Sequence, residues 1–383
     1  MIIKMKHCFR ILVFVICGGL ILPVCSAPSE IQSEGMRLRL EQVAEIAGIP
    51  WGMSFLSAGQ LLLTVRSGTV SLLDVNNGRL SQLKNVPGVL AQGQGGMLDV
   101  AISPNYKKDG WIYFTYVKDV DIDTEGVTVL ARAKLAGDTF EGWQALLITK
   151  SETEKSHHFG SRIAFDTQGH VFFGVGDRGV RKNAQDLTNH AGAIMRLNLD
   201  GSVPSDNPFT KNKTLLPEVW SVGHRNPQGM AYDIENQRLW SIEHGPRGGD
   251  EINLIKPAAN YGWPVISYGK EYWGPVAVGE GTHREGMEQP VKVYVPSIAP
   301  GSLLLYSGDA LPGWKGNLLS GALKLRHLNR IVLSKQGEVI KEERLLEELD
   351  ERIRALAQSP QGWLYFSTDS GKIYRLRPAG VID

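Results

Sequence analysis

The sequence contains little cysteine, and all of it lies near one end. Its three cysteines, Cys8, Cys17 and Cys25, fall within the first 25 residues. If this segment is removed, the mature protein has no thiol, so it can form no disulfide and offers no thiolate ligand to a metal. Any bound metal must then take oxygen or imidazole ligands. A chain of this length can bury a core large enough to fold without disulfides.

The sequence also lacks an excess of charge of either sign. It has 41 basic and 40 acidic residues, well interspersed, and a formal net charge of +1. It has no basic run and no alternation of basic and aromatic residues. No nucleic-acid partner is therefore expected.

The apolar run ILVFVICGGLIL in residues 11–22 is too short to span a bilayer of about 30 Å comfortably. It follows a basic segment (residues 4–10) and precedes small residues ending at Ala27, an order typical of a secretory signal peptide. We predict that residues 1–27 are cleaved off and that the protein is exported, periplasmic or secreted, without stable membrane insertion. Lipidation at Cys25 is the alternative.

A repeat runs through the rest of the chain. Each copy has a short apolar strand, a polar turn usually containing glycine, and a second apolar or aromatic strand ending in small residues, as in IAFDTQGHVFFGVGD (163–177). Taking one residue for each turn gives spacings of 51, 59, 67, 80 and 46 residues. The turn residues are Gly59, Gly110, Gly169, Asn236, Gly316 and Gly362. Such periods, with almost no helical periodicity, are typical of a β-propeller.

The repeat predicts an all-β fold with one domain in residues 28–383: a six-bladed β-propeller with four-stranded antiparallel blades. Residues 36–46 should join the last blade beside residues 372–378 and close the ring, which leaves no free sheet edge. The longest spacings, in residues 170–300, predict inserted loops around the channel mouth. A pair of β-sandwich domains is the alternative, but no linker-like stretch divides the chain.

Corresponding strand ends of a propeller face one channel, so the residues that follow each repeat gather in one place. Here these positions hold cations, an imidazole, several amides and few anions. They include Gln94, His158, Asp177, Arg225, Asn226, Gly245, Pro246, Lys324, Arg352 and Arg354. Such a set suits an anionic ligand with several carboxylates or phosphates.

Three motifs, GQGGMLD, GHRNPQG and DEINLIKPAANYGWP, stand in this order along the chain. With the positions above, they resemble the soluble glucose/sorbosone dehydrogenase family, which uses pyrroloquinoline quinone (PQQ), and most closely its aldose sugar dehydrogenases. The similarity runs from residue 48 to residue 376. It implies PQQ-dependent oxidation of aldose sugars at C1 to the lactone, with Ca²⁺ beside the cofactor. The sequence has no C-x-x-C-H haem motif, so an external electron acceptor is expected.

The resemblance assigns the carboxylates of PQQ to cationic and amide side chains. Arg352 and Arg354 form an R-x-R on a strand, which points both guanidinium groups to one side, and they match the family's carboxylate clamp. Two solvated arginines on an outer strand are the alternative. The other matching cofactor positions are Gln94, Arg225, Asn226, Tyr272 and Lys324.

Three of these assignments have alternatives. Gln92 could take the role of Gln94, and Arg326 that of Lys324. Tyr272, expected as an aromatic wall beside the cofactor, could instead be a buried structural residue.

Gly245 and Pro246 match the family's calcium site. Ca²⁺ prefers oxygen ligands, and a Gly-Pro turn can present two successive carbonyl oxygens because proline has no N–H. The ion would polarise the quinone carbonyl that accepts hydride. A second, structural calcium site would use Glu251 and the backbone carbonyl of Tyr261.

His158 matches the family's general base. Oxidation at C1 removes a proton from oxygen and a hydride from carbon, and an imidazole that is neutral near pH 7 suits the first task. Asp177 would hold the other ring nitrogen and fix its tautomer. Arg225 would face the oxyanion that develops on the quinone. A hydrogen-bonded core histidine is the alternative for His158, and His157 matches no catalytic position.

Two other classes of function also occur on propellers. A calcium-dependent lactonase or esterase would need a central ion held by several carboxylates, whereas the expected channel residues are mostly cationic or amide. A purely binding propeller would leave the converging cations unexplained. The dehydrogenase is therefore the favoured hypothesis.

Overall fold

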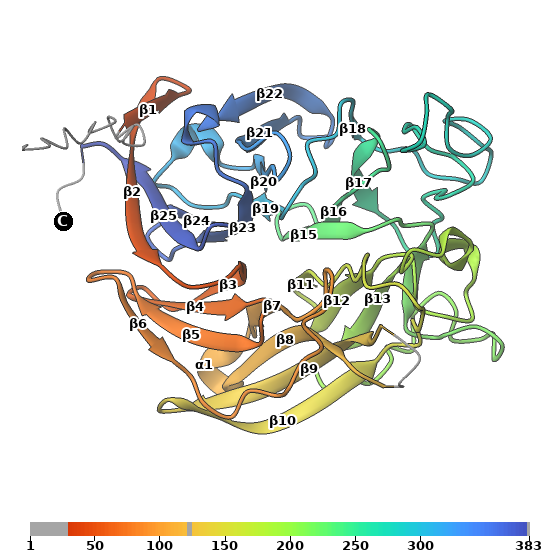
Figure 1. The fold of residues 1–383 in the computed structure, drawn as a ribbon, viewed down its shortest axis with the longest axis horizontal. Coiled ribbons are helices and arrows are strands. Elements are labelled where there is room, and N and C mark those ends of the chain that lie inside the picture. Colours follow the sequence, from red (N-terminus) through yellow and green to blue (C-terminus); the bar gives the residue numbers. More distant parts are fainter. Residues whose placement is uncertain (1–29, 121–124, 381–383) are drawn as a thin grey trace, which may run out of the picture.

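The computed structural model describes residues 30–120 and 125–380, so the predicted signal peptide and Cys25 lie outside the described residues. Within them, six antiparallel sheets surround a central axis (Figure 1). Five sheets have four strands and one has five. The predicted six-bladed all-β propeller is confirmed.

The first three blades follow one another along the chain, each beginning at the channel. Blade 1 contains β3 (Pro50–Ser57), β4 (Gln60–Val65), β5 (Thr69–Asp74) and β6 (Arg79–Gln82). Blade 2 contains β7 (Met97–Ile102), β8 (Trp111–Lys118), β9 (Val127–Ala136) and β10 (Thr139–Ile148). Blade 3 contains β11 (Ile163–Phe165), β12 (His170–Val175), β13 (Ala193–Asn198) and β14 (Val219–Val222).

The other three blades continue the pattern. Blade 4 contains β15 (Pro227–Asp233), β16 (Arg238–Glu243), β17 (Asp250–Ile255) and β18 (Lys292–Tyr294). Blade 5 contains β19 (Leu304–Leu305), β20 (Leu318–Gly321), β21 (Leu328–Leu333) and β22 (Val339–Leu345). Blade 6 contains β23 (Ile353–Gln358), β24 (Leu364–Thr368), β25 (Lys372–Pro378), β2 (Met36–Glu45) and β1 (Glu30–Ser33).

Helix is almost absent. The described residues hold α1 (Tyr106–Asp109) and the short 3-10 helices η1 (Arg181–Gln185), η2 (Pro312–Trp314) and η3 (Glu347–Leu349). In this part of the chain, none of the helices has the length and apolar character needed to cross a membrane.

The apolar core lies between neighbouring blades. In β8 the run Ile112–Val117 is buried without alternation, because both faces of its sheet pack against another blade. Aromatic residues such as Phe114 and Phe140 meet edge-on in these layers at 5.2 Å. Each predicted turn joins the first two strands of a blade. Gly169, for example, has φ +93°, a left-handed conformation that glycine adopts without strain.

The ring closes where the N-terminal strand β2 pairs with the C-terminal strand β25, as the sequence predicted. Glu41 of β2 accepts hydrogen bonds from Arg375 and Arg377 of β25. The fifth strand, β1, extends the connection to blade 5, because Ser33 accepts a hydrogen bond of 2.9 Å from the indole of Trp314. The closing seam is therefore held by polar contacts as well as by strand pairing.

Arg162, at the entrance to β11, ties the blades together at the centre. Its buried guanidinium donates to the carbonyls of Trp51 (3.0 Å), Gln228 (3.0 Å), Gly301 (2.5 Å) and Arg354 (3.1 Å). It also donates to the carboxylate of Asp99 at 3.0 Å. These five acceptors come from the five other blades, so one side chain of blade 3 connects the whole ring.

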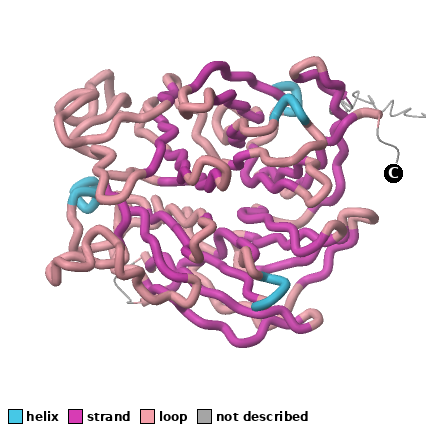
Figure 2. The backbone as a smooth tube through the Cα atoms, turned by 180° about the vertical axis from the view of Figure 1, so that it is seen from behind, coloured by secondary structure: helices cyan, strands magenta, loops and turns pink. Residues whose placement is uncertain are grey.

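The predicted insertions are present as loops. The longest connection within a blade runs from β17 to β18, and Figure 2 shows such loops gathered on the side of the molecule opposite the closing seam. This connection supplies several residues of the site described below.

Candidate active site

His158 and Asp177 form a hydrogen-bonded pair at the end of blade 3. His158 lies in the loop that enters β11, and Asp177 follows β12. His158 Nδ1 lies 2.7 Å from Asp177 Oδ1. Asp177 Oδ1 also accepts from the N–H of Gly179 at 2.8 Å, and Oδ2 accepts from Trp263 Nε1 at 2.7 Å.

These contacts define the tautomer of His158. Burial acts to raise the pKa of Asp177, but the hydrogen bonds from His158 and Gly179 outweigh it and hold this pKa below its ordinary value. An ionised carboxylate only accepts hydrogen bonds, so Nδ1 of His158 must carry its proton and Nε2 the lone pair. Within the described residues, Nε2 of His158 has no hydrogen-bond partner. The geometry therefore leaves one nitrogen free to take a proton.

The imidazole of His158 is neutral near pH 7. Burial, with a smaller contribution from the charge of Arg225, lowers its pKa from 6.5 to about 4, although Asp177 acts in the opposite direction. Its side chain keeps 12% of its surface exposed, so the ring is desolvated but reachable. A base of this kind is already deprotonated when the substrate arrives.

The backbone of His158 is held by the loop that contains Gln94. His158 has φ +61°, a left-handed conformation uncommon for a non-glycine residue. Its N–H donates to Gln94 Oε1 at 2.9 Å, and the N–H of Gln94 donates to Ser156 O at 2.8 Å. The GQGG loop therefore fixes the conformation of the histidine loop.

A cavity of about 280 Å³ lies in the channel, lined by Phe159 and Gly160 next to His158 in the chain, although His158 and Asp177 themselves do not line it. Among the predicted cofactor residues, Gln94, Asn226, Arg352 and Arg354 line it together. Gln92 does not line it, although it stands only two residues before Gln94. The inner strand ends thus converge as the repeat predicted.

The two arginines of the clamp share a carboxylate that the sequence analysis did not include. Asp369 Oδ2 accepts from Arg352 Nε at 2.7 Å and from Arg354 Nη2 at 3.0 Å, while Oδ1 accepts from Arg354 Nε at 2.8 Å. Burial acts to raise the pKa of Asp369, but these hydrogen bonds and charges hold it below its ordinary value. Both arginines face the channel, and Asp369 orients them while offsetting one of their charges.

Arg225 and Asn226 carry buried donors that lack partners. Glu243 Oε2 accepts from the backbone N–H of Arg225 at 2.6 Å and so fixes the turn. Within the described residues, neither Arg225 Nε nor Asn226 Nδ2 has a hydrogen-bond partner. Unsatisfied buried donors are costly, so this pair suits a ligand that brings acceptor atoms.

The other predicted cofactor positions lie further out. Tyr272 is 66% exposed, with its hydroxyl 3.5 Å from Arg225 Nη2, so it stands at the mouth rather than in the core. Lys324 is exposed, and its neighbour Leu323 lines the cavity. Arg326 pairs with Asp350 at 2.8 Å on the surface.

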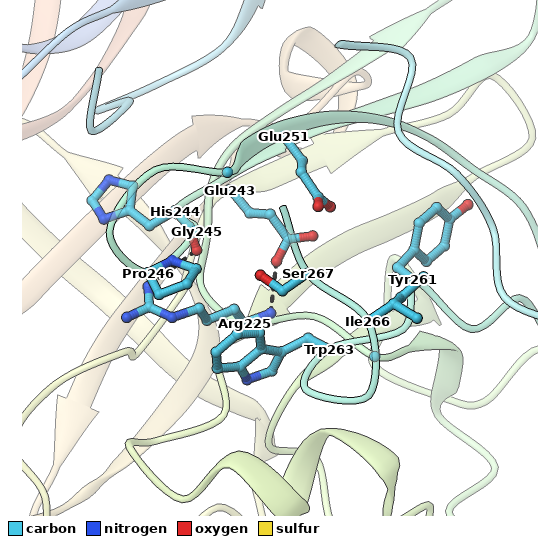
Figure 3. Close-up of a pocket in the computed structure, with 12 residues that line it drawn as sticks. Arg225, Glu243, His244, Gly245, Pro246, Glu251, Tyr261, Trp263, Ile266 and Ser267 are labelled. Atoms are coloured by element: carbon cyan, nitrogen blue, oxygen red, sulfur yellow. Dashed lines mark hydrogen bonds between the residues drawn. The ribbon is translucent and has the colours of Figure 1, made fainter. Parts of the chain in front are cut away.

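A second, very small cavity of about 10 Å³ lies next to Arg225. Gly245, Pro246, Glu251 and Tyr261 all line it, although the sequence analysis assigned them to two separate calcium sites. Glu243 and Glu251 are paired residues of the neighbouring strands β16 and β17, and Figure 3 shows their carboxyl groups close together at this cavity. The phenol of Tyr261 is engaged elsewhere, donating to Leu254 O at 2.7 Å.

Glu251 is the residue of this second cavity that most needs a partner. Burial, and then the neighbouring charge of Glu243, raises its pKa to about 8. Among the residues that the structure describes, Asn253 alone donates a hydrogen bond to its carboxyl group, and this bond is long, at 3.4 Å. The described residues contain no cluster of three or more His, Asp or Glu side chains able to hold a metal. A half-buried carboxyl with one weak partner beside backbone carbonyls nevertheless fits a hard cation.

Sequence reasoning missed Trp263, Glu243 and Asp369. Glu243 and Asp369 stand at the ends of second strands, in SIEHG and STDSG, just as Asp177 ends VGD. The repeat register therefore contained the signal for both. Trp263 lies in the YGWP segment of a quoted motif, but its role depends on a loop path that the sequence does not reveal.

The fold and site together define a propeller whose channel holds a buried histidine–aspartate pair and an arginine-lined cavity. The chain belongs to the glucose/sorbosone dehydrogenase family of oxidoreductases, whose family model, described as Glucose / Sorbosone dehydrogenase, matches residues 47–375. It is 35% identical to aldose sugar dehydrogenase YliI of Escherichia coli over 92% of this chain and 94% of that protein. It is 27% identical to quinoprotein glucose dehydrogenase B of Acinetobacter calcoaceticus over 81% of each.

Solved structures agree with this assignment. The apo-form of the soluble aldose sugar dehydrogenase from Escherichia coli matches with a TM-score of 0.85 and 33% identity, covering 89% of this chain and 99% of that one. The PQQ-bound aldose sugar dehydrogenase from Streptomyces coelicolor matches with a TM-score of 0.72 and 27% identity, covering 92% and 99%.

Proposed function

We propose that this protein is a PQQ-dependent aldose sugar dehydrogenase that oxidises the C1 hydroxyl of an aldose to the lactone. The observation that carries the proposal is the position of His158, a neutral base with a free Nε2, directly before the residues Phe159 and Gly160 of a cavity that is also lined by guanidinium groups. The likeness to sugar dehydrogenases, one of them PQQ-bound, supports the class of cofactor and substrate.

Several residues suit PQQ. Its carboxylates would meet Arg352, Arg354 and the unpartnered donors of Arg225 and Asn226, with Gln94, Lys324 and Tyr272 as the remaining contacts of the family pattern. Gly245, Pro246, Glu251 and Tyr261 would supply oxygen ligands to Ca²⁺. When bound, PQQ supplies a quinone that accepts two electrons.

The protein's own part in the reaction is to move the proton and hold charges. His158 Nε2 takes the proton of the C1 hydroxyl, and Asp177 stabilises the imidazolium through Nδ1–H. This leaves electron density on the C1 oxygen that favours departure of hydride from C1. Arg225 supplies positive charge where negative charge develops. Without an internal haem, the electrons pass on to an external acceptor, and we propose that this occurs outside the cytoplasm.

Reconstitution tests the proposal. The purified protein is mixed with PQQ and Ca²⁺, then assayed with an artificial dye and a panel of aldoses. We expect dye reduction that needs both additions. Lactone hydrolysis without PQQ, or no binding of PQQ by the purified protein, would contradict the proposal.

A further inference from the structure

We propose that Arg66 is a further cofactor-binding residue, and that it also positions the loop that holds His158. The inference rests on the proposed function, because it concerns how the same cavity takes a polycarboxylate. Arg66 follows β4 of blade 1 directly, at the position that Asp369 takes after β24 in blade 6. The register position that holds a carboxylate in blade 6 therefore holds a cation in blade 1.

The charge of the cavity is the first argument. Its fully charged lining residues are Arg66, Arg352, Arg354 and Asp369. The charges of Arg352, Arg354 and Asp369 offset one another in part, because Asp369 accepts hydrogen bonds from both Arg352 and Arg354. Arg66 has no carboxylate partner within the described residues. It therefore supplies a guanidinium charge that is still available to an anion.

The loop geometry is the second argument. Arg66 Nη1 donates to Gly93 O at 2.6 Å and to Gly95 O at 3.2 Å, so it binds the backbone on both sides of Gln94. The backbone of Arg66 is also fixed to this loop, because its carbonyl accepts from the N–H of Met97 at 3.1 Å. A side chain at Gly96 would collide with that carbonyl, since a Cβ would lie 1.9 Å from it.

These contacts form one connected path from cavity to base. Arg66 holds the Gln94 loop, and Gln94 Oε1 accepts the N–H of His158. That contact leaves the amide N–H groups of Gln94 for the cavity. Loss of the guanidinium should therefore weaken PQQ binding and, separately, loosen the histidine loop.

The test compares Arg66→Met, Arg66→Lys and a matched control, Arg79→Met, by titration of PQQ into each purified protein. Arg79 is an exposed arginine at the outer edge of the same blade. We expect Arg66→Met to weaken PQQ affinity about 10- to 100-fold, the range for a hydrogen bond to a charged group. Arg79→Met should bind PQQ like the wild type.

Arg66→Lys separates the two roles and remains informative if Arg66→Met fails to fold. Lysine keeps the charge but cannot hold two carbonyls with one planar group. We expect its PQQ affinity to fall less than that of Arg66→Met, while kcat at saturating PQQ falls at least several-fold. Wild-type affinity and kcat in both variants would overturn this inference and leave the proposed function intact. A wild-type protein that does not bind PQQ would instead overturn the proposed function.

Discussion

Trp263 donates its indole N–H to Asp177 at 2.7 Å, across 86 residues of chain. Trp263 belongs to the loop between β17 and β18 and also lines the small cavity beside Arg225. The loop that surrounds the candidate calcium site is thus the one that holds the carboxylate behind His158. The orientation of the base depends on an insertion far from it in sequence.

Replacement of Trp263 by Phe tests this support. The ring is retained, but a buried carboxylate oxygen loses its donor, which costs about 1–3 kcal/mol. We expect kcat to fall by roughly tenfold while PQQ affinity stays near the wild-type value. Trp143→Phe is the control, because that indole N–H bonds only to Asn85 O near the surface. Equal kcat in the two variants would show that the indole contact does not orient the base.

The pH dependence of kcat/KM should report the low pKa of His158. Acid protonates Nε2 and removes the base, so activity should stay level from neutral pH downward and fall only as pH approaches about 4. His158→Gln should lose turnover by about two to four orders of magnitude and keep its cofactor affinity. An acid limb centred near 6.5 would mean that the base is solvated.

The lowered pKa of His158 also makes the free energy of unfolding depend on pH. The folded pKa of His158 lies below the value of 6.5 in an unfolded chain, so the unfolded state binds more protons between these values. His158 therefore makes the protein less stable as pH falls from about 6.5 to about 4. Chemical denaturation should show a smaller loss over this window in His158→Gln than in the wild type.

Much of the fold followed from the sequence, because a propeller repeats one local pattern. An apolar strand, a turn and a second strand recur, and the same register gives both the blade count and the residues at the channel. For this reason Arg352, Arg354 and Gln94 lie together at the cavity, while their contacts with a cofactor stay a prediction. The pairing of β2 with β25 followed from the need to cover an edge strand.

The features of the site that the sequence did not predict depend on how loops distant in the chain pack together. The merging of two expected calcium sites into one cavity requires the turn at Gly245 to meet the loop at Tyr261, and no periodicity encodes that. Asp369 stands at a strand end, but its pairing with both clamp arginines depends on side-chain positions that the repeat does not encode. The exposure of Tyr272 likewise depends on how its loop folds back over the channel.

Asp369→Asn tests the role of the carboxylate between the clamp arginines. The apo-protein should lose about 1–3 kcal/mol of unfolding free energy, because Arg352 and Arg354 lose their shared negative charge and one of its two acceptor oxygens. PQQ supplies carboxylates, so it should raise the Tm of this variant more than that of the wild type. The control is Asp309→Asn, at an exposed pair with Lys315. Identical Tm shifts in Asp369→Asn and wild type would argue that the cofactor does not reach the clamp.

Calcium should stabilise the protein through Glu251. Calcium that binds only the folded state raises the free energy of unfolding by about 2.7 kcal/mol when the free ion is in hundredfold excess over Kd. Tm rises as a result. Glu251→Gln should lose most of this effect, yet its apo-form should be about as stable as the wild type near pH 7, because a carboxyl with a pKa of about 8 is mostly protonated there and the amide replaces a neutral group of the same shape. Glu141→Gln on an exposed strand serves as control. A full calcium effect in Glu251→Gln would place the ion elsewhere.

Asp99→Asn tests whether the central arginine closes the ring. Asp99 accepts from Arg162 at 3.0 Å and from the N–H of Ile163 at 2.9 Å, and both ionic groups are buried. Loss of the carboxylate leaves a buried guanidinium without its counter-charge, which costs about 3–5 kcal/mol. The matched change Asp138→Asn removes an exposed pair with Lys84 and should cost at most about 1 kcal/mol. Denaturant unfolding measures both, and a similar small loss in the two variants would mean that the carbonyl acceptors of Arg162 suffice to join the blades.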